Sequence, residues 1–179
     1  MINPSVFLTK LQSNQLLLRQ TVLDDFEDLF KLGGSKKIWE QHSEKNRFKK
    51  ENFRRYFING LKNDLGCFTV VKRSNDKILG WTRYYDLNKD NLLITIGYTF
   101  IGMDYWGTQL NFNIKKLMID YAFKHLEEVS FKVYNRNFRS QKAVLKLGAI
   151  FKAKTGDRNE YILSKKVWEK VNNSNLKFL

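Results

Sequence analysis

The chain has 179 residues, and its 32 Lys and Arg against 18 Asp and Glu give it a formal net charge of +14. A hydrophobic fraction of 42% and an aromatic fraction of 15% exclude an intrinsically disordered chain. One proline and ten glycines leave no material for a flexible linker, so we expect a single domain over residues 1–179. We expect its Asn-rich end, residues 172–179, to fray.

A single cysteine, Cys67, excludes an internal disulfide framework and a Cys-rich zinc site, and we expect no metal. No basic-then-apolar leader opens the chain, and no apolar run approaches the roughly 20 residues that cross a bilayer. These features predict a cytoplasmic protein that does not bind membranes. Its positive charge predicts attraction to anions such as phosphates, nucleic acid or acidic proteins.

The first part of the chain predicts a strand and then a helix. Residues 15–19 have strand chemistry, and Thr21 followed by Asp24 predicts a capping box that opens the helix. Gly33 ends it. The apolar stripe of this helix consists of Leu23, Phe26, Leu29 and Phe30.

Residues 38–61 mix aromatic and basic side chains. Phe53, Phe57 and Leu61 have the spacing of a buried helix face. The basic residues are Arg47, Lys49, Lys50, Arg54 and Arg55. A basic patch among aromatics could bind nucleic acid, but we favour a solvated helix face, because Lys and Arg mostly lie at the surface.

The rest of the chain predicts a meander followed by alternating helices and strands. The expected strands are 67–72, 77–85, 92–101, 129–133, 149–154 and 161–163, and the expected helices are 111–126 and 139–147. A strand–helix–strand unit crosses over right-handed, so strands 92–101 and 129–133 should be parallel. We therefore predict an α/β (mixed α+β) domain with one central, mostly antiparallel sheet flanked by helices.

Two segments, residues 98–111 and 135–149, carry the functional signal. In each, a predicted strand leads through a turn directly into a helix, whose first N–H groups lack intrahelical partners and can bind phosphate. Asn137 is placed to cap the second helix. Both helix starts should lie at the carboxyl ends of adjacent parallel strands, where open sheets bind ligands.

These residues resemble the GCN5-related N-acetyltransferases, and most of all their branch of ribosomal-protein and other N-terminal amine acetyltransferases. The likeness covers about residues 16–171 in element order. The motifs that carry it are Leu17-Leu18-Arg19 with Asp24-Asp25, Gly80 to Tyr84, Gly97-Tyr98, Tyr105 to Thr108, and Asn137-x-x-Ser140-x-x-Ala143 ending in Leu147-Gly148-Ala149.

The resemblance implies that acetyl-CoA is the co-substrate and that the acetyl group passes directly to a primary amine. By position, the backbone of Phe100 and Ile101 would bind the pantetheine arm, together with Asn137, in a gap between strands 92–101 and 129–133. Ser140 would lie near the sulfur or the phosphates, and it is the candidate to protonate the leaving thiolate; its alternative role is to satisfy the start of the helix. The turn that would hold the diphosphate consists of Trp106, Gly107, Thr108, Gln109, Leu110 and Asn111.

Several positions depart from the pattern of the family. Gln109 stands where glycine is usual, Val144 where many relatives carry a catalytic tyrosine, and Thr95 where many carry a glutamate. For a general base no residue stands out: Asp86 and Glu160 could face the acceptor cleft, but we favour a solvated surface position for each. These departures motivate an alternative, a catalytically degenerate CoA-binding module or a ribosome- or nucleic-acid-associated module of the same fold.

The acceptor is open at this stage: it is a protein N-terminus, including that of an acidic or ribosomal protein, or a small amine. The resemblance also allows a homodimer. The expected hairpin over residues 152–160 is short, which would leave an acceptor groove open.

Overall fold

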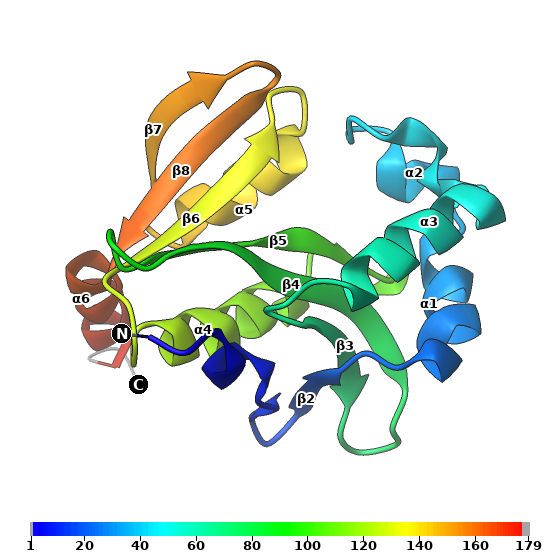
Figure 1. The fold of residues 1–179 in the computed structure, drawn as a ribbon, viewed down its shortest axis with the longest axis horizontal. Coiled ribbons are helices and arrows are strands. Elements are labelled where there is room, and N and C mark those ends of the chain that lie inside the picture. The colour runs from blue at the N-terminus through cyan, green and yellow to red at the C-terminus, as the bar shows by residue number, and fades with distance from the viewer. Residues whose placement is uncertain (1, 177–179) are drawn as a thin grey trace.

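The computed structural model describes residues 2–176, with side chains described through residue 172. Eight strands form one sheet in the order β1-β2-β3-β4-β5-β6-β8-β7. Every neighbouring pair is antiparallel except β5 and β6, which are parallel (Figure 1). The strands are β1 (Leu11–Gln12), β2 (Leu16–Gln20), β3 (Cys67–Lys72), β4 (Ile78–Asn88), β5 (Leu93–Ile101), β6 (Glu128–Tyr134), β7 (Ile150–Thr155) and β8 (Arg158–Ser164).

Helices cover both faces of the sheet, which confirms the predicted fold class (Figure 1). The α-helices are α1 (Phe26–Gly33), α2 (Lys36–Trp39), α3 (Lys50–Leu61), α4 (Leu110–Ala122), α5 (Phe138–Lys146) and α6 (Lys165–Leu176). Short 3₁₀ turns are η1 (Pro4–Leu8), η2 (Leu23–Asp25), η3 (Lys45–Phe48) and η4 (Met103–Tyr105).

Several local predictions need correction. Asp25, rather than Asp24, closes the first capping interaction: its Oδ2 accepts a hydrogen bond from the Val22 amide at 3.0 Å. The turn starts as a 3₁₀ helix, which moves the cap by one residue and leaves Leu23 66% exposed. Thr21 instead accepts a hydrogen bond from the Trp81 indole at 2.7 Å inside the core.

The elements that were not predicted from the sequence include α6, η1 and the two-residue strand β1. The frayed end expected at 172–179 falls partly within α6, and residues 177–179 lie outside the described residues. Trp168 explains why α6 docks: it is 3% exposed, and its indole donates a hydrogen bond to Asp120 of α4 at 2.7 Å.

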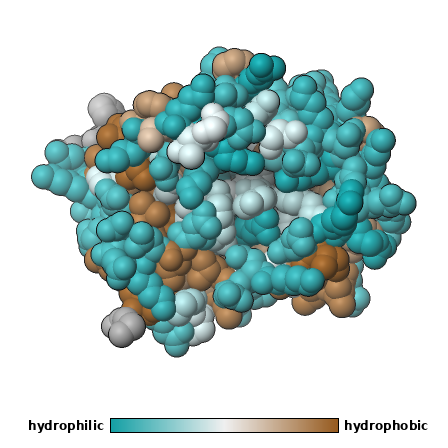
Figure 2. Space-filling view, turned by 45° about the horizontal axis from the view of Figure 1, so that its top comes forward, coloured by the Kyte–Doolittle hydropathy of each residue, from teal (hydrophilic) through white to brown (hydrophobic). Residues whose placement is uncertain are grey.

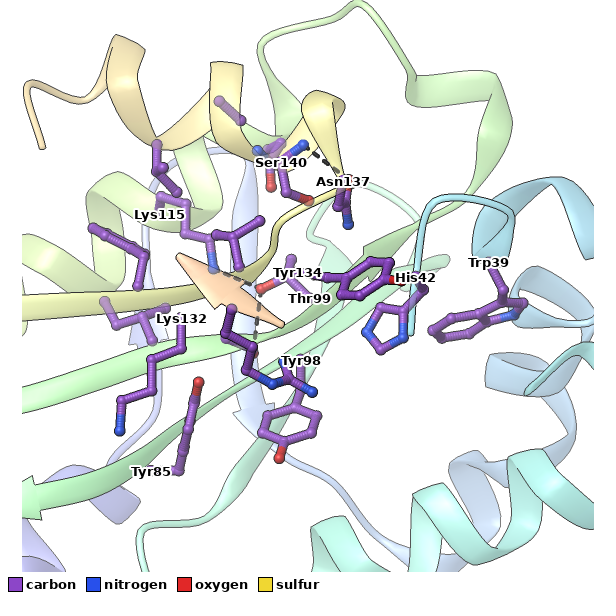
Figure 3. Close-up of a pocket in the computed structure, with 18 of the residues that line it drawn as sticks. Trp39, His42, Tyr85, Tyr98, Thr99, Lys115, Lys132, Tyr134, Asn137 and Ser140 are labelled. Carbon is purple, nitrogen blue, oxygen red and sulfur yellow. Dashed lines mark hydrogen bonds between the residues drawn. The ribbon is translucent and has the colours of Figure 1, made fainter. Parts of the chain in front are cut away.

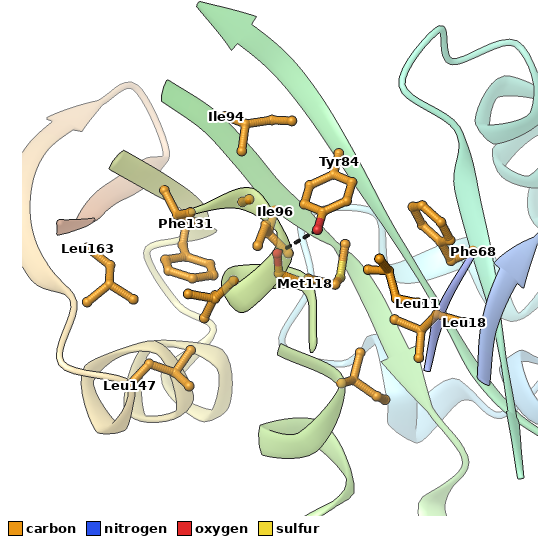
Figure 4. Packing of buried hydrophobic residues seen from close by; sticks show 14 of the residues in the cluster. Leu11, Leu18, Phe68, Tyr84, Ile94, Ile96, Met118, Phe131, Leu147 and Leu163 are labelled. Atoms are coloured by element: carbon orange, nitrogen blue, oxygen red, sulfur yellow. Dashed lines mark hydrogen bonds between the residues drawn. The ribbon is translucent and has the colours of Figure 1, made fainter. Parts of the chain in front are cut away.

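Two hydrophobic cores lie on opposite faces of the sheet. One packs under α4, where Ile94 and Ile96 of β5 meet Met118, and the Tyr84 hydroxyl donates to the Met118 carbonyl at 2.6 Å (Figure 4). The other is largely aromatic and joins α1, α2 and α3 to Trp81 of β4. Alternate strand residues point to opposite faces, so each central strand feeds both cores.

Close approach of α3 to the sheet depends on one glycine. A Cβ on Gly60 would lie 2.2 Å from the Trp81 ring, so only glycine lets the helix backbone pass over that ring.

Figure 2 shows the outside of the molecule from one side: hydrophilic side chains cover most of it, and side chains of intermediate hydropathy gather near its middle. None of the described helices is long and apolar enough to cross a membrane.

Candidate active site

β5 and β6 pair over a short distance and then separate. Leu93 pairs with Glu128 and Thr95 with Ser130, whereas residues 96–101 of β5 have ladder partners only in β4. In Figure 1, β6 turns away from β5 beyond the paired stretch. The unpaired edge of β5 faces a wedge-shaped opening, and its N–H and C=O groups can pair with an extended ligand. Phe100 and Ile101 lie on this edge.

A β-bulge bends β5 where it lines the wedge. The register with β4 shifts between Trp81 and Arg83, so that two residues of β5, Tyr98 and Thr99, lie opposite one residue of β4. Tyr98 has a φ of 52°, which is unusual for a bulky residue. The Tyr56 hydroxyl of α3 donates to the Tyr98 carbonyl at 2.7 Å and helps to hold the bulge.

A cavity of about 130 Å³, open to solvent, occupies the wedge. Of the predicted site residues, Asn111, Asn137 and Ser140 line it. Figure 3 shows Asn137 and Ser140 on one side and Tyr98 on the opposite side, with Thr99 between them.

The turn before α4 leaves several backbone amides without hydrogen-bond partners in the described part of the chain. Gly107 has a φ of +78° and open space around it, so the conformation favours glycine. Within the described residues, the amides of Gln109, Asn111 and Phe112 donate no hydrogen bond. The Gln109 side chain is exposed and does not fill the turn.

The remaining residues of this turn have structural partners. The Thr108 hydroxyl donates to the Tyr105 carbonyl at 2.7 Å and accepts from the Leu110 amide at 3.3 Å. The Arg139 guanidinium lies 4.0 Å from the centre of the Trp106 ring, which places a positive charge beside the start of α4. Thr108, Gln109 and Leu110 face a second, open hollow rather than the cavity in the wedge.

The start of α5 presents a hydroxyl to the cavity. Asn137 caps the helix, since its Oδ1 accepts from the Ser140 amide at 3.1 Å. The Ser140 hydroxyl has no hydrogen-bond partner among the described residues. Val144, one turn further on, is 5% exposed and also lines the cavity, so no phenolic hydroxyl stands there.

Lys115 of α4 is a cavity residue that the sequence analysis missed. It is 5% exposed, and its ammonium donates to the Thr99 hydroxyl at 2.6 Å (Figure 3). Burial lowers the pKa of Lys115 to about 7. The only sequence signal was its place beside Ile114 on the buried side of the helix, and a lysine at such a position usually reaches solvent.

Neither predicted base candidate lines the cavity. Asp86 forms an ion pair with Lys132 at 2.9 Å, and Glu160 accepts a hydrogen bond from Ser130 at 2.8 Å. Thr95, where relatives often carry glutamate, is fully buried, and its hydroxyl has no partner among the described residues. These groups lie on the sheet face that carries Arg83 and Tyr85, opposite the α4 face.

The predicted basic patch in residues 47–55 is also not uniformly solvated. Arg47 packs against Tyr56, with its guanidinium 4.3 Å from the ring centre, and its Nη1 lies 3.1 Å from Nε2 of His42. Lys50 pairs with Glu27, and Arg55 bonds to Asn52. Arg47 therefore packs against His42, a cavity residue, rather than on an exposed helix face.

Comparison with known families identifies the fold. A family model described as an acetyltransferase (GNAT) domain matches residues 15–150. This chain belongs to the GNAT acetyltransferases. Members of the family use acetyl-CoA as the acetyl donor, and this chain is accordingly an acetyl-CoA-dependent acetyltransferase. A search of curated proteins found no match.

Solved structures of GNAT proteins share the architecture. A GCN5-related N-acetyltransferase from Brucella melitensis superposes with a TM-score of 0.82 at 15% identity over 93% of this chain and 83% of its own. A spermidine N-acetyltransferase from Vibrio cholerae, solved with CoA and spermine, gives 0.68 at 13% identity over 88% and 99%. A proposed ribosomal-protein-serine acetyltransferase from Vibrio cholerae gives 0.71 at 15% identity over 91% and 99%. At these identities, the likeness establishes the fold.

Proposed function

We propose that this GNAT acetyltransferase transfers acetyl directly from acetyl-CoA to a primary amine. The observation that carries the proposal is the polar wedge between β5 and β6, where unpaired strand edge, Ser140 and Asn137 meet. A covalent acetyl-cysteine route has no support, because Cys67 is 2% exposed in β3 and is not among the residues that line the cavity. Burial also raises the pKa of its thiol, which disfavours the nucleophilic thiolate.

The chain's polar groups fit the donor. The diphosphate of acetyl-CoA would bind the amides of Gln109, Asn111 and Phe112 at the start of α4, where the helix dipole favours negative charge. Arg139 would add a guanidinium there. The backbone of residues 96–101 and the Asn137 side chain would hold the pantetheine amides, which leaves the thioester within the wedge.

The transfer requires two proton movements. The amine first loses a proton, because it must attack in its neutral form. Its nitrogen then bonds to the acetyl carbon while the carbon–sulfur bond breaks. One amine proton then ends on the departing sulfur, which gives an acetamide and a free thiol. The Ser140 hydroxyl is the proposed proton donor to that sulfur, and the Lys115 ammonium provides a second proton donor in the same cavity. The N–H groups of the bulged strand would donate a hydrogen bond to the developing oxyanion.

A second candidate is a catalytically degenerate module that binds CoA without transfer. Val144 and Thr95 favour it, because neither supplies the tyrosine or glutamate that many relatives use. A transfer assay across a panel of primary amines, with detection of the free thiol, separates the two. Turnover well above the rate without enzyme rejects the degenerate module, and donor binding without turnover on any amine rejects the transferase.

Two glycine substitutions test the donor site. Gly107→Ala places a side chain at a φ of +78° in the proposed diphosphate turn, whereas Gly156→Ala does so at +57° in the β7–β8 turn. Neither added Cβ meets another atom within 4 Å, so the backbone costs are similar. We expect Gly107→Ala to weaken acetyl-CoA binding about tenfold in calorimetry, and Gly156→Ala to leave it unchanged. Equal affinities for both variants would contradict the placement of the diphosphate.

A further inference from the structure

The cavity wall has one sign of charge. Its lining includes Lys115, Lys132 and Arg158, and no Asp or Glu of the described residues lines it. The proposed phosphate site lies at the start of α4 and shares Asn111 with the cavity lining, and the acetyl and pantetheine parts of the donor are uncharged. The donor therefore leaves Lys132 and Arg158 unexplained.

Two further arginines stand directly behind the wall. Arg83 is 7% exposed, forms no ion pair or hydrogen bond within the described residues, and has a buried Nε without a partner. Its guanidinium lies 3.4 Å from the centre of the ring of Tyr98, a cavity residue. Arg47 has no ion pair in the described part of the chain and contacts His42, which also lines the cavity.

Buried guanidinium groups without a carboxylate are costly, and packing on an aromatic ring leaves their in-plane N–H donors available. The carboxylates of Asp86 and Asp157 pair with residues of the cavity lining and not with these two arginines: Asp86 binds Lys132 at 2.9 Å, and Asp157 lies 3.9 Å from Arg158. His42 lies in the positive field of these arginines. Burial, then the charges of Arg47 and Arg158, lower the pKa of His42 to about 3.

Resting on the proposed transfer to an amine, we propose that the acceptor is a small amine that also carries a carboxylate or phosphate. Its anionic group binds at Arg158, and Arg47 and Arg83 reinforce the attraction from behind the wall. Such a group offers the planar, bidentate partner that arginine prefers. The same positive field disfavours a protonated amine, so an acceptor anchored by its anion presents a neutral nitrogen to the acetyl carbon. Polyamines, with several positive charges, are excluded.

Matched acceptors test the charge. Ethanolamine and phosphoethanolamine form one pair, β-alanine and its amide form another, and spermidine represents polyamines. We expect the anionic member of at least one pair to have a kcat/KM at least about tenfold above its partner and above spermidine, the scale of one charge-assisted hydrogen bond. The two pairs distinguish phosphate from carboxylate.

Equal rates within both pairs, or faster turnover of spermidine, would overturn the inference and leave the proposed function standing. No turnover with any amine, despite acetyl-CoA binding, would overturn the proposed function and this inference with it.

Substitution then tests the arginines. Arg158→Gln and Arg83→Gln should each raise the KM for the anionic acceptor about tenfold, with the KM for acetyl-CoA unchanged. Arg55→Gln, at an exposed position of α3, is the matched control and should change neither. Because Arg83 is buried, the kinetics of Arg83→Gln are interpreted only if circular dichroism and melting show a folded protein. If it does not fold, the test rests on Arg158→Gln. Unchanged KM values in a folded Arg158→Gln variant would overturn the inference.

Discussion

At the scale of single residues, Lys115 presents a conflict between stability and function. Its ammonium is buried under the wedge with the Thr99 hydroxyl as its partner, and it forms no ion pair within the described part of the chain. Such a group costs folding free energy when charged. Its retention at the floor of the cavity, beside the proposed path of the acetyl group, is consistent with a part in the reaction.

Lys115→Met should stabilise the protein at pH 7 and reduce turnover. Thr99 keeps Thr82 as a partner at 2.7 Å, and removal of an unpaired buried charge gains about 1–4 kcal/mol, or a rise in Tm of about 2–4 °C per kcal/mol. The folded pKa of about 7 lies below the ordinary 10.5, so between these values the unfolded chain binds more protons. Wild-type stability therefore rises with pH across this window.

Melting curves at pH 7 and pH 10 measure this effect. The advantage of Lys115→Met should shrink at the higher pH, where the wild-type lysine is neutral in the folded state. Lys116→Met, which removes an exposed i,i+4 pair with Asp120, should be neutral or slightly destabilising. A Lys115→Met protein that melts below wild type at pH 7 would show that the bond to Thr99 outweighs the buried charge.

At the scale of elements, the start of α5 combines a structural and a binding role. Asn137 caps the helix through its side-chain oxygen, and its amide N–H groups are the donors proposed for the pantetheine arm. The helix start and the wedge therefore share one residue. A substitution that keeps an oxygen acceptor but removes the amide separates these roles.

Asn137→Ala should lose about 1 kcal/mol of stability and also weaken acetyl-CoA binding, because both functions disappear. Asn137→Ser should keep the stability, since serine is a comparable cap, but should share the loss of binding. Melting temperature and calorimetric affinity measured on both variants decide the matter. Wild-type affinity in Asn137→Ser would restrict Asn137 to capping.

At the scale of the whole molecule, the charge of +14 acts on the anionic donor before contact. Long-range attraction raises encounter rates and is screened by salt, with a Debye length of about 10 Å at 0.1 M. We expect kcat/KM for acetyl-CoA to fall about three- to tenfold between 50 and 500 mM salt. The KM for an uncharged amine should change little. If kcat/KM for acetyl-CoA does not change with salt, the net charge serves another purpose.

Much of this fold follows from local patterns in the chain. The limits of β3 match the expected strand at residues 67–72, and the parallel pairing of β5 with β6 follows from chain order and crossover handedness. The open turn at Gly107 and the cap at Asn137 were also visible, because glycine and asparagine have strong local preferences at such positions. Asp25 and α6 were missed: the first depended on a one-residue shift, the second on docking of Trp168.

The sequence by itself determined the class of the fold, the order of its elements and the two helix starts beside the wedge, because these depend on periodicity and turn chemistry within short segments. Only the tertiary structure decided which charges are buried. Arg47, Arg83 and Lys115 look like surface residues along the chain, and their exposure depends on elements that pack over them from distant segments. Burial and pairing of charge are properties of the assembled core, and here they mark the side of the cavity where we place the acceptor.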